Sequence, residues 1–367
     1  MNMVGVLGQY VCQLQICGED FINELKDIHF FNITFSAGID IPKMEISFKT
    51  DPKRKLWQKI KENKPLKFYF GKERGDYIFE FYVRNMRVGM DMEYVKIYLS
   101  GYLKNPSYYF TTDIISFNNK STVDVLKEYL PKCGFSVDLK YEPTCNNIQT
   151  WINPNQTQYS FLKHLIKHYN GSSTIATGFG LDGNLRLWCL DKLSKAKPKV
   201  EFVYGVEETQ IQKLYNLDDT ENKYEFGLMN AYGGYDLNIH DYNLLNDKNV
   251  KTDIKNQTKK LTPEIAKKFD FKTYKGTFYH SENISKDYYS SYFKNKKELA
   301  SVNTSRLFIV TANKFIEASV LDIAKLNPPK LNEYFIGNYI INNINYTYQN
   351  KMFKTTFTIV RENYNML

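Results

Sequence analysis

The sequence has few cysteines, and no two of them have the C-x-x-C spacing. Its 367 residues contain five, an odd number: Cys12, Cys17, Cys133, Cys145 and Cys189. A disulfide framework needs paired cysteines, and a structural zinc site needs closely spaced ones. The pattern argues against both, and we expect the thiols to be small buried or half-buried hydrophobic side chains.

Long apolar runs are also missing. No segment approaches the roughly 18 to 20 apolar residues that a membrane-spanning helix needs. The N-terminal segment has no basic start, and Gln9, Gln13 and Gln15 interrupt its apolar residues, which argues against a secretion signal. We therefore expect no membrane span and a chain that folds in a cytoplasm.

Motifs of the common enzyme classes are absent as well. There is no G-x-S-x-G and no P-loop. Gly178-Phe179-Gly180 lacks the third glycine and the helix of a dinucleotide-binding loop, so we interpret it as a turn. His164 and His168 have the spacing of a zinc pair on a helix, but no third ligand is evident and lysines flank both. We expect these two histidines to lie on a solvated polar face, and we predict no catalytic, cofactor-binding or metal-binding residue.

Charge is unbalanced towards lysine. The net charge is +9, with denser basic runs over residues 53–74 and 251–275. A basic surface permits contact with nucleic acid. However, acidic residues are interspersed throughout and no nucleic-acid-binding motif accompanies the lysines, so we interpret the excess as a solvated surface.

What the sequence does contain is alternation of apolar and polar residues. From Gly8 to Leu103 this alternation predicts around six strands, with one short helix containing Leu56, Trp57 and Ile60. Such a set folds as a closed barrel or a sandwich. Aromatic strand faces could line a carbohydrate site, but packing in the core explains alternating Phe and Tyr more simply.

Helix and strand signals alternate between Ser121 and Leu190. Ser121 is a candidate cap for a helix that Pro131 and Gly134 end. A second helix is predicted to start near Thr157 and to end at Gly171.

Strands accompany these two helices. Strand alternation over Phe135 to Leu139 follows the first helix, and Trp151 closes a loop rich in Asn and Pro. Asp182-Gly183 predicts a tight hairpin before a strand over residues 185–189. The order of a helix, the Trp loop, "NQTQYSFLKHLIKHYNG" and "DGNLRLWCL" resembles a module of the baseplate hub proteins of contractile phage tails, and of the related N-terminal part of type VI secretion spike proteins.

The C-terminal stretch from Leu307 to Arg361 is rich in strands again. Its segments "EYFIGNYIINNINYTYQ" and "KMFKTTFTIVREN" are similar to the end of a tail-tube-like barrel: a G-x-Y-x-I strand from Gly337, a hairpin and a final alternating strand. Phe79 to Gly101 can be laid beside Gly337 to Arg361, with an aromatic strand, a polar turn and an alternating strand in each. This faint repeat suggests two barrels of one kind.

The resemblance implies a fold that is mainly β with α+β insertions, namely two tail-tube-like β-barrels in one chain plus smaller mixed domains. We assign the first barrel to residues 1–110 and an α+β linking domain to residues 111–195. The second barrel takes residues 196–246 and 306–367, and a polar, partly helical insertion of residues 247–305 splits it.

The resemblance also implies a structural role without a cofactor. Hubs of this kind look like homotrimers whose barrels form a pseudo-sixfold ring, which adapts the sixfold tail tube to the threefold central spike. Implied partners are the spike, the tail tube or tube-initiator protein and baseplate wedge proteins, while DNA and the tape-measure protein pass through the channel. No OB domain or β-helix repeat follows the second barrel, so we expect a separate spike. The implied location is the virion tail baseplate, assembled in the host cytoplasm.

Two other functions stay open. One is a glycan- or receptor-binding tail protein, and the other is a tail-associated peptidoglycan hydrolase, whose paired carboxylates would meet only in three dimensions. A hub from a phage-derived injection machine, such as a contractile bacteriocin, would have the same sequence features as a phage hub.

The insertion offers one candidate partner interface. "TPEIAKKF", residues 262–269, predicts a short helix with a first-turn proline. A second predicted helix over residues 285–302 places four aromatic residues along one side: Tyr288, Tyr289, Tyr292 and Phe293. Aromatic residues are favoured anchors at interfaces, although packing onto the chain's own second barrel explains them equally well.

Overall fold

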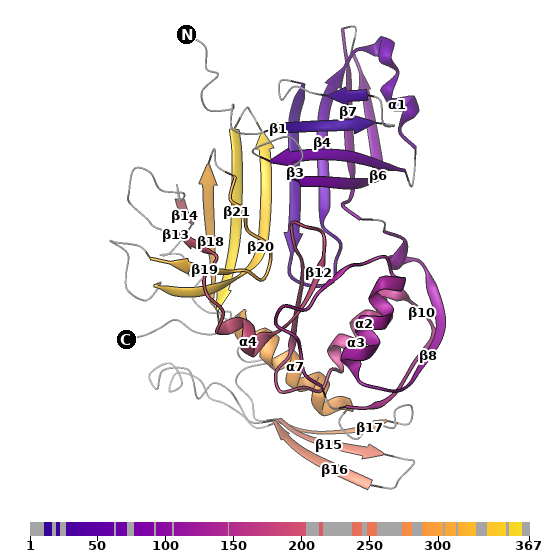
Figure 1. The fold of residues 1–367 in the computed structure, drawn as a ribbon, viewed down its shortest axis with the longest axis vertical. Coiled ribbons are helices and arrows are strands. Elements are labelled where there is room, and N and C mark those ends of the chain that lie inside the picture. The colour runs from indigo at the N-terminus through magenta and orange to yellow at the C-terminus, as the bar shows by residue number, and fades with distance from the viewer. Residues whose placement is uncertain are drawn as a thin grey trace.

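The structure is a computed structural model built mainly from β-strands (Figure 1). It describes residues 11–16, 20–22, 27–61, 64–71, 77–91, 93–104, 106–145, 147–202, 213–215, 237–243, 248–254, 274–280, 288–303, 305–312, 315–327, 336–349 and 352–361. One large sheet contains strands from both ends of the chain, and in Figure 1 the middle of the chain lies below it.

The N-terminal strands form one half of the large sheet. They are β1 (Val11–Ile16), β2 (Asp20–Ile22), β3 (Ile28–Ser36), β4 (Lys43–Thr50), β5 (Pro65–Gly71), β6 (Tyr77–Met90) and β7 (Val95–Tyr102). All pairs are antiparallel, in the order β3-β4-β7-β6-β5-β1-β2. The 3-10 turn η1 (Pro52–Arg54) and the short helix α1 (Leu56–Lys59) connect β4 to β5, as the helical spacing of Leu56 and Ile60 predicts.

The other half of the sheet comes from the C-terminal part of the chain. Its strands are β13 (Val200–Phe202), β14 (Lys213–Tyr215), β18 (Ser305–Ala312), β19 (Ile323–Leu326), β20 (Gly337–Gln349) and β21 (Met352–Arg361). The order is β14-β18-β21-β20, and β19 pairs with both β20 and β13.

Both halves use one strand order. In the order of the sheet, strands β14, β18, β21 and β20 of the second half correspond one to one to β3, β4, β7 and β6 of the first half. Neighbouring strands are antiparallel in both halves. In each half the strand that precedes the final hairpin, β5 or β19, pairs with the N-terminal part of that hairpin. The repeat that the sequence suggests between residues 79–101 and 337–361 is therefore a repeat of β6–β7 and β20–β21.

The middle of the chain mixes helices and small sheets. Its elements are η2 (Pro106–Tyr109), β8 (Thr112–Lys120), α2 (Thr122–Lys132), β9 (Val137–Asp138), β10 (Gln149–Thr157), α3 (Gln158–Lys167), β11 (Ile175–Phe179), β12 (Leu185–Cys189) and α4 (Leu190–Ser194). The predicted cap at Ser121 is confirmed, because its side chain accepts a hydrogen bond from the Asp124 backbone N–H at 3.2 Å. Thr157, where the second helix is predicted to start, caps α3 in the same way by accepting from the Ser160 backbone N–H at 3.2 Å. The predicted hairpin at Asp182-Gly183 joins β11 to β12.

The loop predicted to close at Trp151 ends earlier, because strand β10 begins at Gln149 and contains Trp151. This strand pairs with β8 in a two-stranded ribbon that curves around α2 and α3 (Figure 1). The register shifts near Asn155, which has a φ of 78°. Asn tolerates this left-handed conformation, and a bulge of this kind admits the Asn- and Pro-rich sequence into a strand.

The insertion contributes strands as well as a helix. β15 (Leu237–Asn243), β16 (Lys248–Ile254) and β17 (Tyr274–His280) form a separate three-stranded sheet, and α7 (Tyr288–Val302) follows. β15 thus lies outside the large sheet, although the sequence analysis gave it to the second barrel. The helix predicted over residues 262–269 lies outside the described residues, and the exact domain boundaries stay a prediction.

A buried ion pair ties the middle of the chain to the second half. The guanidinium of Arg186, on β12, lies 2.8 Å from the Asp322 carboxylate and donates to the Val320 carbonyl at 2.8 Å. Asp322 also accepts the Ser319 backbone N–H at 2.8 Å. Both side chains are largely buried. Replacing either residue would therefore leave the charge of the other one buried without its partner.

One glycine tests how closely β6 approaches β7. A Cβ atom on Gly101 would lie 1.9 Å from the Tyr82 carbonyl oxygen, whereas one on Gly89 would meet nothing nearer than 4.0 Å. We expect Gly101→Ala to lower the free energy of unfolding by about 1–3 kcal/mol, as overpacking does. Urea denaturation should show little change for the matched variant Gly89→Ala, and equal effects of the two would contradict the close approach.

Candidate functional site: the strand edges of the two halves

The two halves join edge to edge inside one chain. β20 pairs antiparallel with β3, from Asn343 opposite Ser36 to Gln349 opposite Phe30. Their side chains meet on both faces of this seam. Thr347 Oγ1 lies 3.1 Å from Asn32 Oδ1 on one face. On the other face, the rings of Phe31 and Tyr348 stack at 5.6 Å.

A bulge separates two uses of the same strand edge. The N-terminal part of β20, up to Ile340, pairs with β19, and the register on β21 then shifts between Ile341 and Asn343. The part from Asn343 onward is what pairs with β3. Because a bulge increases the twist of a strand, it turns the C-terminal part of the edge towards a new partner.

The first half contains the same arrangement without the seam. The N-terminal part of β6, up to Tyr82, pairs with β5, and the register on β7 shifts between Val83 and Asn85. Beyond this bulge, no described strand pairs with residues 85–90 on the side away from β7. Among the strands that the structure describes, the second half of β6 is therefore an open edge where β20 has β3.

Exposure of equivalent side chains follows from this difference. Counting from the bulge, Met86 and Met90 of β6 correspond to Ile344 and Tyr348 of β20. Met86 is 39% and Met90 71% exposed, whereas Ile344 is 0% and Tyr348 3% exposed. An exposed strand edge with apolar side chains is a common site of strand pairing between chains.

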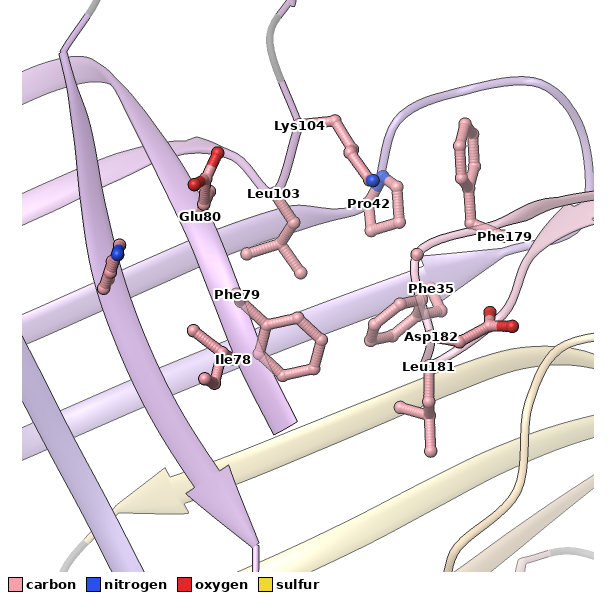
Figure 2. A pocket seen from close by; sticks show the side chains of 12 residues that line it. Phe35, Pro42, Ile78, Phe79, Glu80, Leu103, Lys104, Phe179, Leu181 and Asp182 are labelled. Carbon is pink, nitrogen blue, oxygen red and sulfur yellow. The ribbon is translucent and has the colours of Figure 1, made fainter. Parts of the chain in front are cut away.

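A pocket of about 310 Å³ lies where the first half meets the β11–β12 hairpin (Figure 2). Apolar side chains form its walls, among them Phe35, Phe79 and Leu103. Four charged side chains, Lys67, Glu80, Lys104 and Asp182, also line it. The lining therefore combines apolar walls with charges of both signs.

The aromatic interface predicted on the insertion is partly described. On α7, the Tyr292 ring stacks on His168 at 5.4 Å between centroids, and Phe293 packs edge-on against Tyr292 at 5.2 Å. Both aromatic residues are half-buried. Tyr292 thus packs within its own chain, against the middle segment. Side chains of Tyr288 and Tyr289 lie outside the described residues, so their role at an interface stays a prediction.

Polar side chains of α7 hold the end of α3. Asn295 Nδ2 donates to the carbonyl oxygens of Lys167 at 3.0 Å and Tyr169 at 2.7 Å. The buried Glu298 carboxylate accepts the Thr174 backbone N–H at 2.6 Å. Helix ends leave carbonyl groups unpaired, so these bonds fasten α7 to α3 specifically.

The solvated face predicted for His164 and His168 is wrong. His168 is buried, and the two rings lie 4.7 Å apart. Trp151 packs edge-on against His164 at 6.0 Å. Burial, followed by the nearby charge of Lys167, lowers the pKa of His164 below its ordinary value. Sequence spacing around α3 could not show this, because the covering helix comes more than a hundred residues later.

The described cysteines are buried or half-buried, as the sequence analysis expects. Cys133 and Cys189 are buried and Cys145 is half-buried, all as free thiols. Burial raises the pKa of Cys133 to about 12, which makes it a poor nucleophile. Within the described ranges, no group of three or more His, Cys, Asp or Glu side chains has the arrangement of a metal site. None of the described helices has the length and hydropathy to cross a membrane.

A second exposed surface was missed by the sequence analysis. The outward face of the β8–β10 ribbon carries Ile114, which is 84% exposed, with Ile152 close by and also exposed. Phe117 and Trp151 on the opposite face are buried. Alternation predicts that one face of a strand is buried but does not show whether an apolar outer face meets solvent or a partner.

Comparisons with known proteins find relatives in structure alone. No protein-family model matches the sequence, and no curated protein does. The tail protein from Neisseria meningitidis MC58 has a TM-score of 0.62 at 11% identity, over 96% of this chain and 97% of its own. The 43 kDa tail protein of prophage MuSo2 from Shewanella oneidensis has a TM-score of 0.62 at 12% identity, over 96% and 97%.

A third similar structure comes from a secretion system. It is an Escherichia coli component of the type VI secretion system, described as similar to the T4 bacteriophage tail proteins gp27 and gp5. Its TM-score is 0.56 at 9% identity, over 95% of this chain and 76% of its own. The chain therefore has the fold of phage tail and type VI secretion proteins, which confirms the resemblance and the mainly β fold class.

The lowered pKa of His164 predicts how stability depends on pH. A lowered pKa in the folded state means that the unfolded chain takes up a proton first. The contribution of His164 is therefore present above about pH 6.5 and is lost as the pH falls towards the lowered value. We expect His164→Gln to flatten this loss in urea denaturation between pH 7.5 and 5.5.

The control for this experiment is a second histidine. The pKa of His29 is also lowered, by burial and by the charges of Lys49 and Lys96. His29→Gln therefore measures how much of the pH dependence of the unfolding free energy comes from a histidine outside the α3–α7 contact. Identical slopes for the native chain and His164→Gln would contradict the prediction.

Proposed function

We propose that this chain is a structural baseplate hub of a contractile phage tail or of a phage-derived injection machine. The observation that carries the proposal is the internal repeat, in which two halves with one strand order join edge to edge in a single chain. The similarity of the fold to phage tail proteins and to a type VI secretion component supports a role in a tail.

The repeat gives the hub its symmetry. A surface that pairs with a different surface of the next unit forms a closed ring only when the rotation between units matches. Two similar halves in each chain and three chains give six similar units. Such a homotrimer presents a pseudo-sixfold face to a tail tube and a threefold face to a central spike.

Partners follow from this geometry. The ring binds the tail tube or its initiator on one side and the spike on the other, and its central channel passes DNA and the tape-measure protein. The exposed face of the β8–β10 ribbon supports a contact with a further tail protein, such as a baseplate wedge component. The function is mechanical, since buried interface area stabilises the assembly without a cofactor.

Mass and symmetry of the purified chain test the proposal. Light scattering should give about three times the chain mass of 43.2 kDa, and negative-stain electron microscopy should show a threefold particle with six lobes around a hole. The spike protein is then added to the same preparation. A particle that remains monomeric both alone and with the spike would contradict the hub and favour a glycan- or receptor-binding tail protein.

A further inference from the structure

We infer that the open edge of β6, residues 85–90, is the docking site for strand β14 of a second copy of this chain. The inference rests on the proposed ring and names the strands that would close it. It follows from the internal repeat, because the seam between β3 and β20 shows how one half of this fold pairs with the next.

The two halves can be matched residue by residue across the sheet. In the first half, one row of paired residues runs Phe31, Ile46, Leu99, Met86. In the second half, the row at the same place runs Leu214, Ile309, Phe357, Ile344. Each row begins on the first strand of its half, β3 or β14, and ends on β6 or β20 at the second residue after the bulge. β14 is therefore the counterpart of β3, and Leu214 holds the position of Phe31.

The seam then fixes the register of the contact between copies. Phe31 pairs with Tyr348, four residues beyond Ile344 on β20. The equivalent position on β6, four residues beyond Met86, is Met90. In the proposed contact Leu214 of the second copy therefore lies opposite Met90. By the same step, Tyr215 lies opposite Gly89.

Residue types at these positions suit a contact between strands. Lys213 lies opposite Asp91 in this register, and directly opposed residues of opposite charge stabilise antiparallel strands. The exposed Met90 gains an apolar position across from it. Gly89 leaves room beside an aromatic position, since a Cβ atom there would meet nothing nearer than 4.0 Å. These three pairings are compatible with the register that the seam gives.

Exposure on the β6 edge supports a second copy as the occupant. Tyr348 of β20, whose ring stacks on Phe31 of β3, is 3% exposed, whereas Met90 at the matching position of β6 is 71% exposed. A counterpart of β3 would cover Met90 as Phe31 covers Tyr348. The counterpart of β3 is β14. Among the described strands, β14 pairs with β18 along one edge and ends the strand order, so its other edge has no described partner.

Disulfide trapping tests the register. Residues directly opposite on antiparallel strands have Cα atoms about 4.5–5.5 Å apart, a distance that a disulfide spans. The test variant is Gly89→Cys with Tyr215→Cys. The matched control is Asn32→Cys with Thr347→Cys, which occupies the equivalent positions in the intrachain seam.

We expect the test variant to form covalent dimers and trimers on non-reducing gels, and the control to form only an intrachain bond. Both should revert with reductant, and the single variants correct for the five native cysteines. A one-residue shift, Gly89→Cys with Leu214→Cys, should trap poorly, because neighbouring residues of a strand face opposite sides.

The outcomes separate this inference from the proposed function. A threefold ring seen by microscopy without the Gly89–Tyr215 crosslink would overturn the interface and leave the hub in place. Absence of both the ring and the crosslink would overturn both. As an independent check, Asp91→Lys should reduce the trimer fraction severalfold at low ionic strength, and adding Lys213→Asp should restore it. No rescue by the double variant would contradict the register.

Discussion

Every strand at the margin of a sheet leaves backbone N–H and C=O groups without partners, and the seam between β3 and β20 satisfies them inside one chain. This pairing makes the N-terminal and C-terminal strands a single sheet, although the two strands lie some three hundred residues apart. The rest of the architecture depends on it, because the middle segment and the insertion then have a fixed frame on which to pack.

Placement of the insertion is consistent with that frame. β3 and β4 are joined directly by residues 37–42, whereas the equivalent strands β14 and β18 enclose the whole insertion. The inserted residues lie in the connection between β14 and β18, so the pairing of these two strands is kept. α7 then returns to the middle of the chain, where Asn295 and Glu298 bind the backbone at the end of α3. A long insertion is tolerated because its two ends are already held close by the sheet.

Local signals in the sequence were reliable where a few neighbouring residues decide the structure. Ser121 and Thr157 cap helices with their own hydroxyls, and Asp182-Gly183 makes its turn with a glycine φ of 75°. Distant contacts were the source of error. His164 has a polar-looking sequence environment, yet Trp151 and His168 pack against its ring, and α7 covers His168 from far along the chain. No periodicity within α3 carries that information.

The same reasoning explains why the repeat is faint in the sequence and plain in the structure. Ile97 on β7 corresponds to Thr355 on β21, and both are 0% exposed, while Gly101 corresponds to Ile359. What the halves share is the alternation of buried and exposed positions and the place of the bulge in the hairpin. These two features set which edge faces which partner, since a shift of one residue would turn every buried side chain outward. Side-chain identity is free to change within that limit, so this fold can be kept while its sequence diverges beyond recognition.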